Sequence, residues 1–225
     1  MVPGYKEVME RFHEERLAWD WSQQEISSKM GITQSHFSKA ELGKKRFMYE
    51  QIKRLNETEF DLHYVFTGNR VEKTKRLDIL EHVSASECYF LGRLFYVLLE
   101  QLSERRSAPQ YEAVRKQSSI MRYVLDNRQK SIWRLVRDYC DCTQAEMADF
   151  FKFDLKKYAC LENEKTYPDS ESIYLLYKHF YIPPQIVLGD NRGIVRSIYD
   201  AMAELDDGDY AKLVDFIKLQ QEMFG

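Results

Sequence analysis

The amino-acid sequence predicts an all-α fold in which one helical unit occurs twice. Apolar residues recur at intervals of three and four, as in Ile173, Leu176 and Phe180, and no sustained apolar-polar alternation with hairpin turns interrupts this pattern. The chain has only nine glycines, and its five prolines fall where helices would start or stop. Together with the internal repeat described below, these patterns predict about fifteen helices and no sheet.

The composition is that of an ordinary folded protein. Charged residues make up 31% and hydrophobic residues 44% of the 225 positions, which excludes a disordered chain and a membrane protein. The longest apolar run, residues 88–99, contains Arg93 and is shorter than the roughly 20 residues that span a bilayer. Residues 1–7 lack the features of a signal peptide, so we expect a cytoplasmic protein with reduced cysteines.

Two short helices near the N-terminus are separated by a glycine. Ser22 can cap a helix over residues 23–30, Gly31 then breaks the chain, and Thr33 can cap a helix over residues 34–42. Two short helices joined by a tight turn that contains glycine form a helix-turn-helix unit. The residues expected on the buried sides of these helices are Ile26, Met30 and Phe37.

A repeat becomes visible when the chain is aligned with itself at a shift of 121 residues. Ten identities fall among the 53 positions from 16 to 68, where unrelated segments would give about three. The identical pairs are Arg16/Arg137, Asp20/Asp141, Gln23/Gln144, Glu25/Glu146, Glu41/Glu162, Lys44/Lys165, Glu50/Glu171, Ile52/Ile173, Leu55/Leu176 and Gly68/Gly189. Apolar character is kept at Phe12/Trp133, Ile26/Met147, Met30/Phe151 and Phe37/Tyr158.

The repeat divides the chain into four segments. The first copy spans residues 1–70, a helical connector spans 71–128, the second copy spans 129–190, and a C-terminal helical hairpin spans 191–225. The connector is expected to contain a similar hairpin over residues 80–102. Helical hairpins are therefore predicted to join and flank the two copies.

Charge is distributed unevenly along the chain. Residues 1–70 carry 11 basic and 11 acidic side chains, residues 71–130 carry 11 and 8, and residues 131–225 carry 11 and 17. Because phosphates attract cations, we expect a phosphate-binding surface in the first half of the chain rather than in the last.

Residues 21–45, WSQQEISSKMGITQSHFSKAELGKK, and the later LHYVFTG of residues 62–68 resemble the DNA-binding domain of the phage repressor and Cro (Xre) family. The resemblance covers about residues 5–70, and a weaker version covers 128–190. It implies five helices in each copy, a bacterial or phage origin, and usually dimeric binding to a near-palindromic operator. It also implies ion pairs between a first-helix arginine and the glutamate after the recognition helix, here Arg16 with Glu41 and Arg137 with Glu162.

The helix over residues 34–42 carries side chains suited to reading bases in the major groove. Gln34 can bond adenine in a bidentate manner, Lys39 can donate to guanine, and Ser35 can bond either base. These features predict a transcriptional regulator that binds double-stranded DNA sequence-specifically. The phosphate contacts are expected at Gln23, Thr33, Lys44, Lys45 and Arg46.

The second copy departs from this pattern at four positions. Lys152, Leu155, Cys160 and Glu164 replace Gly31, Gln34, Lys39 and Gly43, respectively. A lysine at a turn that needs a positive φ costs energy, and Glu164 would repel phosphates. Two interpretations stay open, a scaffold without DNA contact and a second DNA site. The second site would use Gln144, Lys156, Lys157 and Lys165.

The cysteines of the second copy have two interpretations. Cys140, Cys142 and Cys160 invite a zinc or redox site, but structural zinc sites usually need paired Cys-x-x-Cys or histidine ligands, and a fourth ligand is not apparent. Cys142 matches Trp21, which suits a small buried hydrophobe. We therefore expect no metal.

Residues 88–102 are apolar at 11 of 15 positions, which is too broad for one buried stripe. This helix must be covered by the second copy, by another chain, or by a ligand. Because two-fold symmetric dimers are the commonest oligomers, we predict a homodimer whose contacts include this region. The residues that would line an effector pocket are Tyr89, Phe90, Phe95 and Tyr96.

Motifs for catalysis are missing from the sequence. It contains no phosphate-binding glycine-rich loop and no His-Glu-x-x-His pair, and its five histidines are dispersed, so we expect neither an enzyme nor a cofactor. The alternative to DNA binding is a protein-interaction adaptor whose acidic C-terminal half binds a protein partner. A third interpretation is a small-molecule or redox sensor in the central helices.

Overall fold

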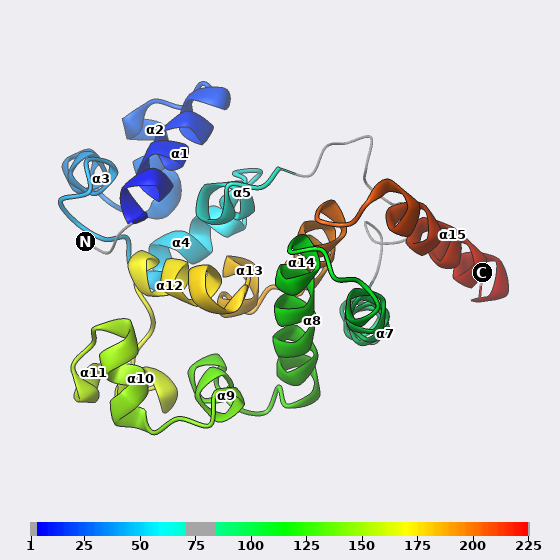
Figure 1. Cartoon of the computed structure of the whole chain (residues 1–225). Helices are drawn as coiled ribbons and strands as arrows, with labels where there is room; N and C mark the ends of the chain where they lie inside the picture. Colours follow the sequence, from blue (N-terminus) through cyan, green and yellow to red (C-terminus); the bar gives the residue numbers. More distant parts are fainter. Residues whose placement is uncertain (1–3, 71–83, 225) are drawn as a thin grey trace. The chain divides into compact units, whose positions relative to one another are not determined.

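The computed structural model describes residues 4–70 and 84–224 (Figure 1). Within these residues every regular element is a helix, and the only β-bridge is an isolated one between Met48 and Asp169. The all-α prediction is therefore confirmed for the described part. The chain forms two compact units: unit 1 comprises Met1–Arg70 with Lys130–Asp190, and unit 2 comprises Val71–Gln129 with Asn191–Gly225.

Unit 1 contains both copies of the repeat, with five helices in each. The helices of the first copy are α1 (Tyr5–Ala18), α2 (Gln23–Met30), α3 (Gln34–Glu41), α4 (Tyr49–Asn56) and α5 (Leu62–Thr67). Those of the second copy are α9 (Ile132–Tyr139), α10 (Gln144–Phe151), α11 (Leu155–Glu162), α12 (Ser170–Phe180) and α13 (Pro184–Val187). The ends of α10 and α11 lie 121 residues after those of α2 and α3.

The two copies also share their backbone turns. Four pairs of residues at matching positions all have positive φ, the left-handed conformation that usually ends a helix. The repeat therefore extends from side-chain identity to backbone geometry. The pairs are Asp20/Asp141, Gly31/Lys152, Gly43/Glu164 and Gly68/Gly189.

Buried aromatic and aliphatic side chains hold each copy together. In the first copy, the Phe12 ring lies 4.9 Å from the Phe47 ring and 6.0 Å from the Phe37 ring, centroid to centroid. In the second, Trp133 meets Phe151 edge-on at 5.3 Å. The predicted burial of Ile26, Met30 and Phe37 is confirmed. All positions at which the repeat keeps apolar character are at most 3% exposed: Phe12, Ile26, Met30, Phe37, Trp133, Met147, Phe151 and Tyr158.

Unit 2 covers the broad apolar helix with its own helices. Its elements are α7 (Ala85–Glu104), α8 (Gln110–Asp126), α14 (Arg192–Ala203) and α15 (Asp207–Phe224). Helix α7 packs along α8 and α14, and the approach at Gly92 is so close that a Cβ there would lie 2.6 Å from Ile194. Phe95, Tyr96 and Leu99 are buried as a result. Within unit 2, α8 and α14 therefore cover these residues of α7.

The hairpins are described in part. The helix expected to begin at residue 80 would start outside the described residues, and α7 begins after Ser84, whose hydroxyl accepts from the Glu87 amide. The C-terminal hairpin predicted over residues 191–225 consists of α14 and α15, and its turn lies between Ala203 and Asp207. Arg106, between α7 and α8, ties this hairpin to the rest of unit 2 by donating two hydrogen bonds of 2.7 Å to the buried Asp209.

Candidate functional site

Helices α2 and α3 are fixed at both ends by local hydrogen bonds. The Glu25 amide donates to Ser22 Oγ over 3.2 Å, and the Ser22 amide donates to Glu25 Oε2 over 2.7 Å, which makes a reciprocal cap at the start of α2. Gly31 ends α2 with a φ of 70°. The Thr33 hydroxyl then accepts from the His36 amide over 3.2 Å and starts α3. The capping roles predicted for Ser22 and Thr33 are confirmed.

A buried carboxylate at the end of α3 ties the first copy together. Arg16 Nε donates to Glu41 Oε1 over 2.9 Å, and Arg16 Nη1 donates to the Trp21 carbonyl over 2.7 Å. Gln23 Nε2 donates to Glu41 Oε2 over 2.7 Å, and His13 Nδ1 lies 3.0 Å from Oε1. Burial raises the pKa of Glu41, but the hydrogen bonds from Arg16, His13 and Gln23 outweigh burial and hold that pKa below its ordinary value.

Helix α3 has a buried side and an exposed side. Phe37 and Ala40 are fully buried in the core of the first copy. The three predicted base-reading residues, Gln34, Ser35 and Lys39, are all exposed. The exposed side of α3 therefore presents amide, hydroxyl and ammonium groups to solvent, while the opposite side anchors the helix.

The basic run after α3 divides into two parts. Lys44, Lys45 and Arg46 are all exposed, and Arg46 Nη2 in addition forms an ion pair with the buried carboxylate of Glu171 in the second copy. Gln23, also predicted as a phosphate ligand, uses its amide nitrogen on Glu41. The structure thus places all three basic side chains at the surface, and it gives Arg46 and Gln23 a protein partner each.

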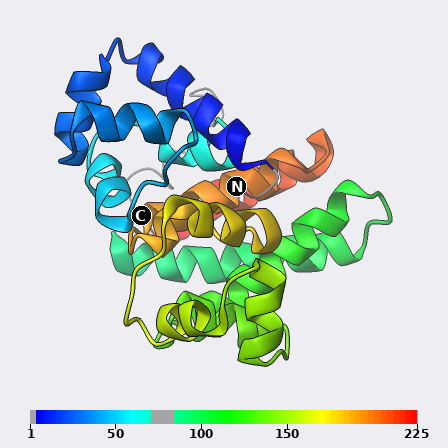
Figure 2. The same ribbon diagram turned by 90° about the vertical axis from the view of Figure 1, so that its left-hand side faces the viewer.

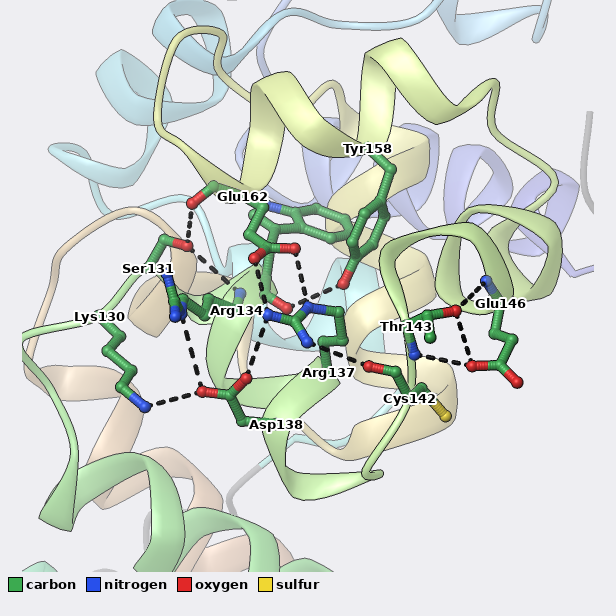
Figure 3. Close-up of polar contacts among 11 residues, drawn as sticks. Lys130, Ser131, Arg134, Arg137, Asp138, Cys142, Thr143, Glu146, Tyr158 and Glu162 are labelled. Atoms are coloured by element: carbon green, nitrogen blue, oxygen red, sulfur yellow. Dashed lines mark hydrogen bonds and ion pairs between the residues drawn. The ribbon is translucent and has the colours of Figure 1, made fainter.

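The second copy repeats this framework (Figure 3). Thr143 and Glu146 form the reciprocal cap of α10. Arg137 donates to both Glu162 oxygens over 3.0 Å and to the Cys142 carbonyl over 3.1 Å, whereas Arg16 donates to one Glu41 oxygen and to the Trp21 carbonyl. Both ion pairs implied by the family resemblance are therefore present.

The second copy has further bonds around its first helix. Lys130 Nζ lies 2.7 Å from Asp138 Oδ2, and this hydrogen bond lowers the Asp138 pKa. Ser131 Oγ donates to the Glu162 carbonyl over 2.6 Å. Tyr158 OH donates to the Trp133 carbonyl over 2.9 Å, and burial raises the pKa of Tyr158 above its ordinary value. Figure 3 draws these side chains around the Arg137 guanidinium.

The exposed side of α11 differs in chemistry from that of α3. Leu155, at the position of Gln34, is 51% exposed, and Lys156, at the position of Ser35, is exposed too. Lys157 lies over the Phe153 ring at 3.9 Å and 3.5 Å from Asp169, so its charge is held against the protein. The remaining residues predicted for a second DNA site differ in exposure: Lys165 is exposed and Gln144 is half-buried.

A cluster that the sequence did not reveal joins the two copies. The Ser170 hydroxyl is fully buried, accepts from the Phe47 amide over 3.1 Å and is hydrogen-bonded to Tyr5 OH. Ser170 donates its own amide to the Phe47 carbonyl over 2.8 Å. Tyr49 stacks on Tyr167 with ring centroids 4.5 Å apart. No local sequence signal marks these residues, because each partner lies in the other copy.

The cysteines form no disulfide and no metal site in the described part of the chain. All four cysteines are thiols, and burial raises the pKa of Cys140. Within residues 4–70 and 84–224 no group of three or more histidine, cysteine or carboxylate side chains is arranged to hold a metal. No described helix has the length and apolar character that crossing a bilayer requires. Comparison with known protein families, curated proteins and solved structures finds no match to this chain.

Proposed function

We propose that the chain is a cytoplasmic, non-enzymatic transcriptional regulator that binds duplex DNA sequence-specifically, and that its two copies are tandem helix-turn-helix domains of the repressor and Cro type. One observation carries the proposal. Helix α3 is anchored by the buried Phe37 and Ala40 and turns Gln34, Ser35 and Lys39 to solvent. This is the arrangement that a recognition helix needs, because its outer side must enter a groove while its inner side stays fixed.

The side chains of α3 match the donors and acceptors of base edges. The major groove is about 12 Å wide, and a helix with its side chains is about 10–12 Å across, so α3 fits it. The Gln34 amide offers one donor group and one acceptor, which pair with adenine N7 and N6. Lys39, one turn further along α3, is exposed and can donate to guanine.

Phosphate contacts would come mainly from the lysines that follow α3. Lys44 and Lys45 are exposed, and each carries a positive charge that can neutralise a phosphate. Thr33 is exposed at the N-terminus of α3, where backbone amides attract anions. Arg46 and Gln23 would contribute beside them, since Arg46 is exposed although it pairs with Glu171, and Gln23 is positioned by its bond to Glu41.

The experiment that tests the proposal is a gel-shift titration of the whole chain on random and on selected duplexes at several salt concentrations. A chain that neutralises several phosphates loses affinity steeply as salt rises, and a sequence-specific chain binds the selected duplex more tightly at every salt. Absence of binding to both duplexes at the lowest salt would replace the DNA-binding proposal with the adaptor.

The adaptor is the second candidate because the second copy exposes apolar side chains. Phe150 is 48% and Leu155 is 51% exposed, and residues 131–225 carry 17 acidic against 11 basic residues. Exposed apolar groups, together with the acidic balance of the C-terminal half as a whole, suit a basic, partly apolar protein partner. In the gel-shift titration such an adaptor would leave every duplex unbound.

A further inference from the structure

Two hydrogen bonds between the copies join the same pair of repeat positions, with the two copies interchanged. Asn56 Nδ2 donates to Asp190 Oδ2 over 2.7 Å, and Asn69 Nδ2 donates to Tyr177 OH over 3.3 Å. A shift of 121 residues takes Asn56 to Tyr177 and Asn69 to Asp190. The two bonds therefore join the same two positions in opposite senses, which is what a two-fold axis between the copies produces.

Elements that meet their own counterparts mark the position of this axis. Met48 and Asp169 occupy matching positions and pair in an antiparallel bridge. Helix α5 packs against α13, its counterpart in the second copy. Self-pairing of the same surface is the defining property of an isologous, two-fold interface. Unit 1 is thus organised as a dimer made within one chain.

This pseudo-symmetry also relates α3 to α11. Both helices lie along the left margin of unit 1 in Figure 1, with α4 and α12 between them, and Figure 2 views unit 1 from that side. A dimeric helix-turn-helix protein needs two reading helices related by a two-fold axis, so that they enter successive turns of the major groove. Unit 1 supplies both helices without a second chain.

The charge of the second reading helix is compatible with DNA. Residues 152–165 contain four lysines against three carboxylates, and one of these carboxylates, Glu162, is bound by Arg137. The matching segment of the first copy, residues 31–44, has two lysines against Glu41, so both segments have a net charge of +1. The acidity of the second half of the chain is therefore not concentrated at α11.

The reading chemistry of α11 is apolar where that of α3 is polar. Leu155 is 51% exposed at the position of Gln34, and an exposed apolar side chain in the major groove contacts the methyl group of thymine. Lys156, exposed at the position of Ser35, can donate to guanine or to a phosphate. The two helices are related in position but would prefer different bases.

We propose that one chain binds one operator composed of two unlike half-sites, with α3 on the first half-site and α11, through Leu155 and Lys156, on the second. This inference rests on the proposed function, since it needs the chain to bind DNA through α3. It also means that the expected homodimer is not required for two-headed binding. The operator is accordingly not palindromic.

The test uses the full chain and a duplex selected from a random pool. Native mass spectrometry gives the number of chains per duplex, and footprinting gives the protected bases. We expect one chain per duplex and two protected, unlike half-sites with centres about 10 base pairs apart. Two chains on a palindromic duplex, or one protected half-site alone, would overturn the inference while leaving the proposed function intact.

A crossed set of variants assigns each helix to its half-site. The affinity of L155A/K156A for the full operator should be about tenfold lower than that of the wild type. Scrambling the second half-site should not lower the affinity of this variant further. Q34A/S35A is the matched control: its affinity should not change when the first half-site is scrambled and should still fall when the second half-site is scrambled. All four positions are exposed, so we expect both variants to fold and to have melting temperatures close to that of the wild type. Full affinity of L155A/K156A would show that α11 does not contact bases and would overturn this inference. If neither the variants nor the wild type bind any duplex, the proposed function itself fails.

Discussion

Lys152 adopts the left-handed backbone conformation that Gly31 adopts at the matching position of the first copy, with φ values of 56° and 70°. A residue with a Cβ pays a steric cost in this conformation that glycine avoids. The turn is therefore kept in the second copy although its glycine is lost.

This relationship predicts that substitutions at the two turns have opposite effects on stability. Lys152→Gly should raise the free energy of unfolding by about 1 kcal/mol, since it removes the strain of the left-handed turn. Gly31→Ala should lower it by about 1 kcal/mol, because the added Cβ is strained and meets the Arg54 guanidinium. Urea unfolding followed by tryptophan fluorescence measures both, because Trp19, Trp21 and Trp133 all belong to unit 1. A lower free energy of unfolding for Lys152→Gly would contradict the claim that the backbone at Lys152 is strained.

Glu41→Gln should destabilise unit 1 by about 3 kcal/mol. The Arg16 side chain is only 8% exposed, so loss of the Glu41 charge leaves a buried guanidinium without its counterion. The same urea titration measures the change. Glu50→Gln is the control, since Glu50 is exposed on α4, and it should change stability by less than about 0.5 kcal/mol. Equal changes in the free energy of unfolding for the two substitutions would show that the Arg16–Glu41 ion pair does not stabilise unit 1.

Acid should destabilise the wild-type chain partly through Glu41. Its folded-state pKa lies below the ordinary value of 4.5, so the stabilisation is complete above that pH and is lost as the pH falls through the folded-state pKa. Melting temperatures should therefore fall as the pH drops below about 4.5. The Glu41→Gln variant lacks this titration, and its melting temperature should depend less on pH in that window. Parallel pH profiles of the two proteins would contradict the pKa assignment.

Base reading and phosphate binding should separate in two single variants of the first copy. Gln34→Ala should cost about 1–3 kcal/mol on the selected duplex and little on random DNA, because it removes a base contact. Lys44→Ala should weaken binding to all sequences alike and flatten the salt dependence, because it removes a phosphate contact. Fluorescence anisotropy at several salt concentrations measures both effects.

The control for these two variants is Lys116→Ala, which makes the same charge change in unit 2. Lys116 is exposed beside Glu112 on α8, outside the proposed interface. Its affinity should match that of the wild type. A Gln34→Ala variant that weakens binding to random and selected duplexes equally would refute base reading by Gln34.

Local signals predicted the short helices of unit 1 closely. Ser22 and Thr33 cap the helices that they were expected to cap, and the α2 and α3 pattern recurs at α10 and α11 with matching ends. Such features depend on neighbouring residues, so the sequence contains them directly. The Arg16–Glu41 pair also followed from sequence, but only through the resemblance to a known family.

Contacts between distant segments could not be predicted in the same way. Arg46 belongs to a basic run that suggested a phosphate ligand, and nothing in that run indicates its ion pair with Glu171 in the other copy. Likewise, Gly92 gave no sign that α14 would pack there. A hydrophobic pattern says which side of a helix is buried, but not what buries it.

The measurement that tests the central claim most directly is methylation interference on the selected duplex, because it reports contact with guanine N7 in the major groove. If α3 reads bases there, methylation of a guanine within the first half-site should abolish binding by the wild-type chain. Lys39→Ala should lose this sensitivity at one guanine. Equal binding of methylated and unmethylated duplexes would contradict major-groove reading by α3.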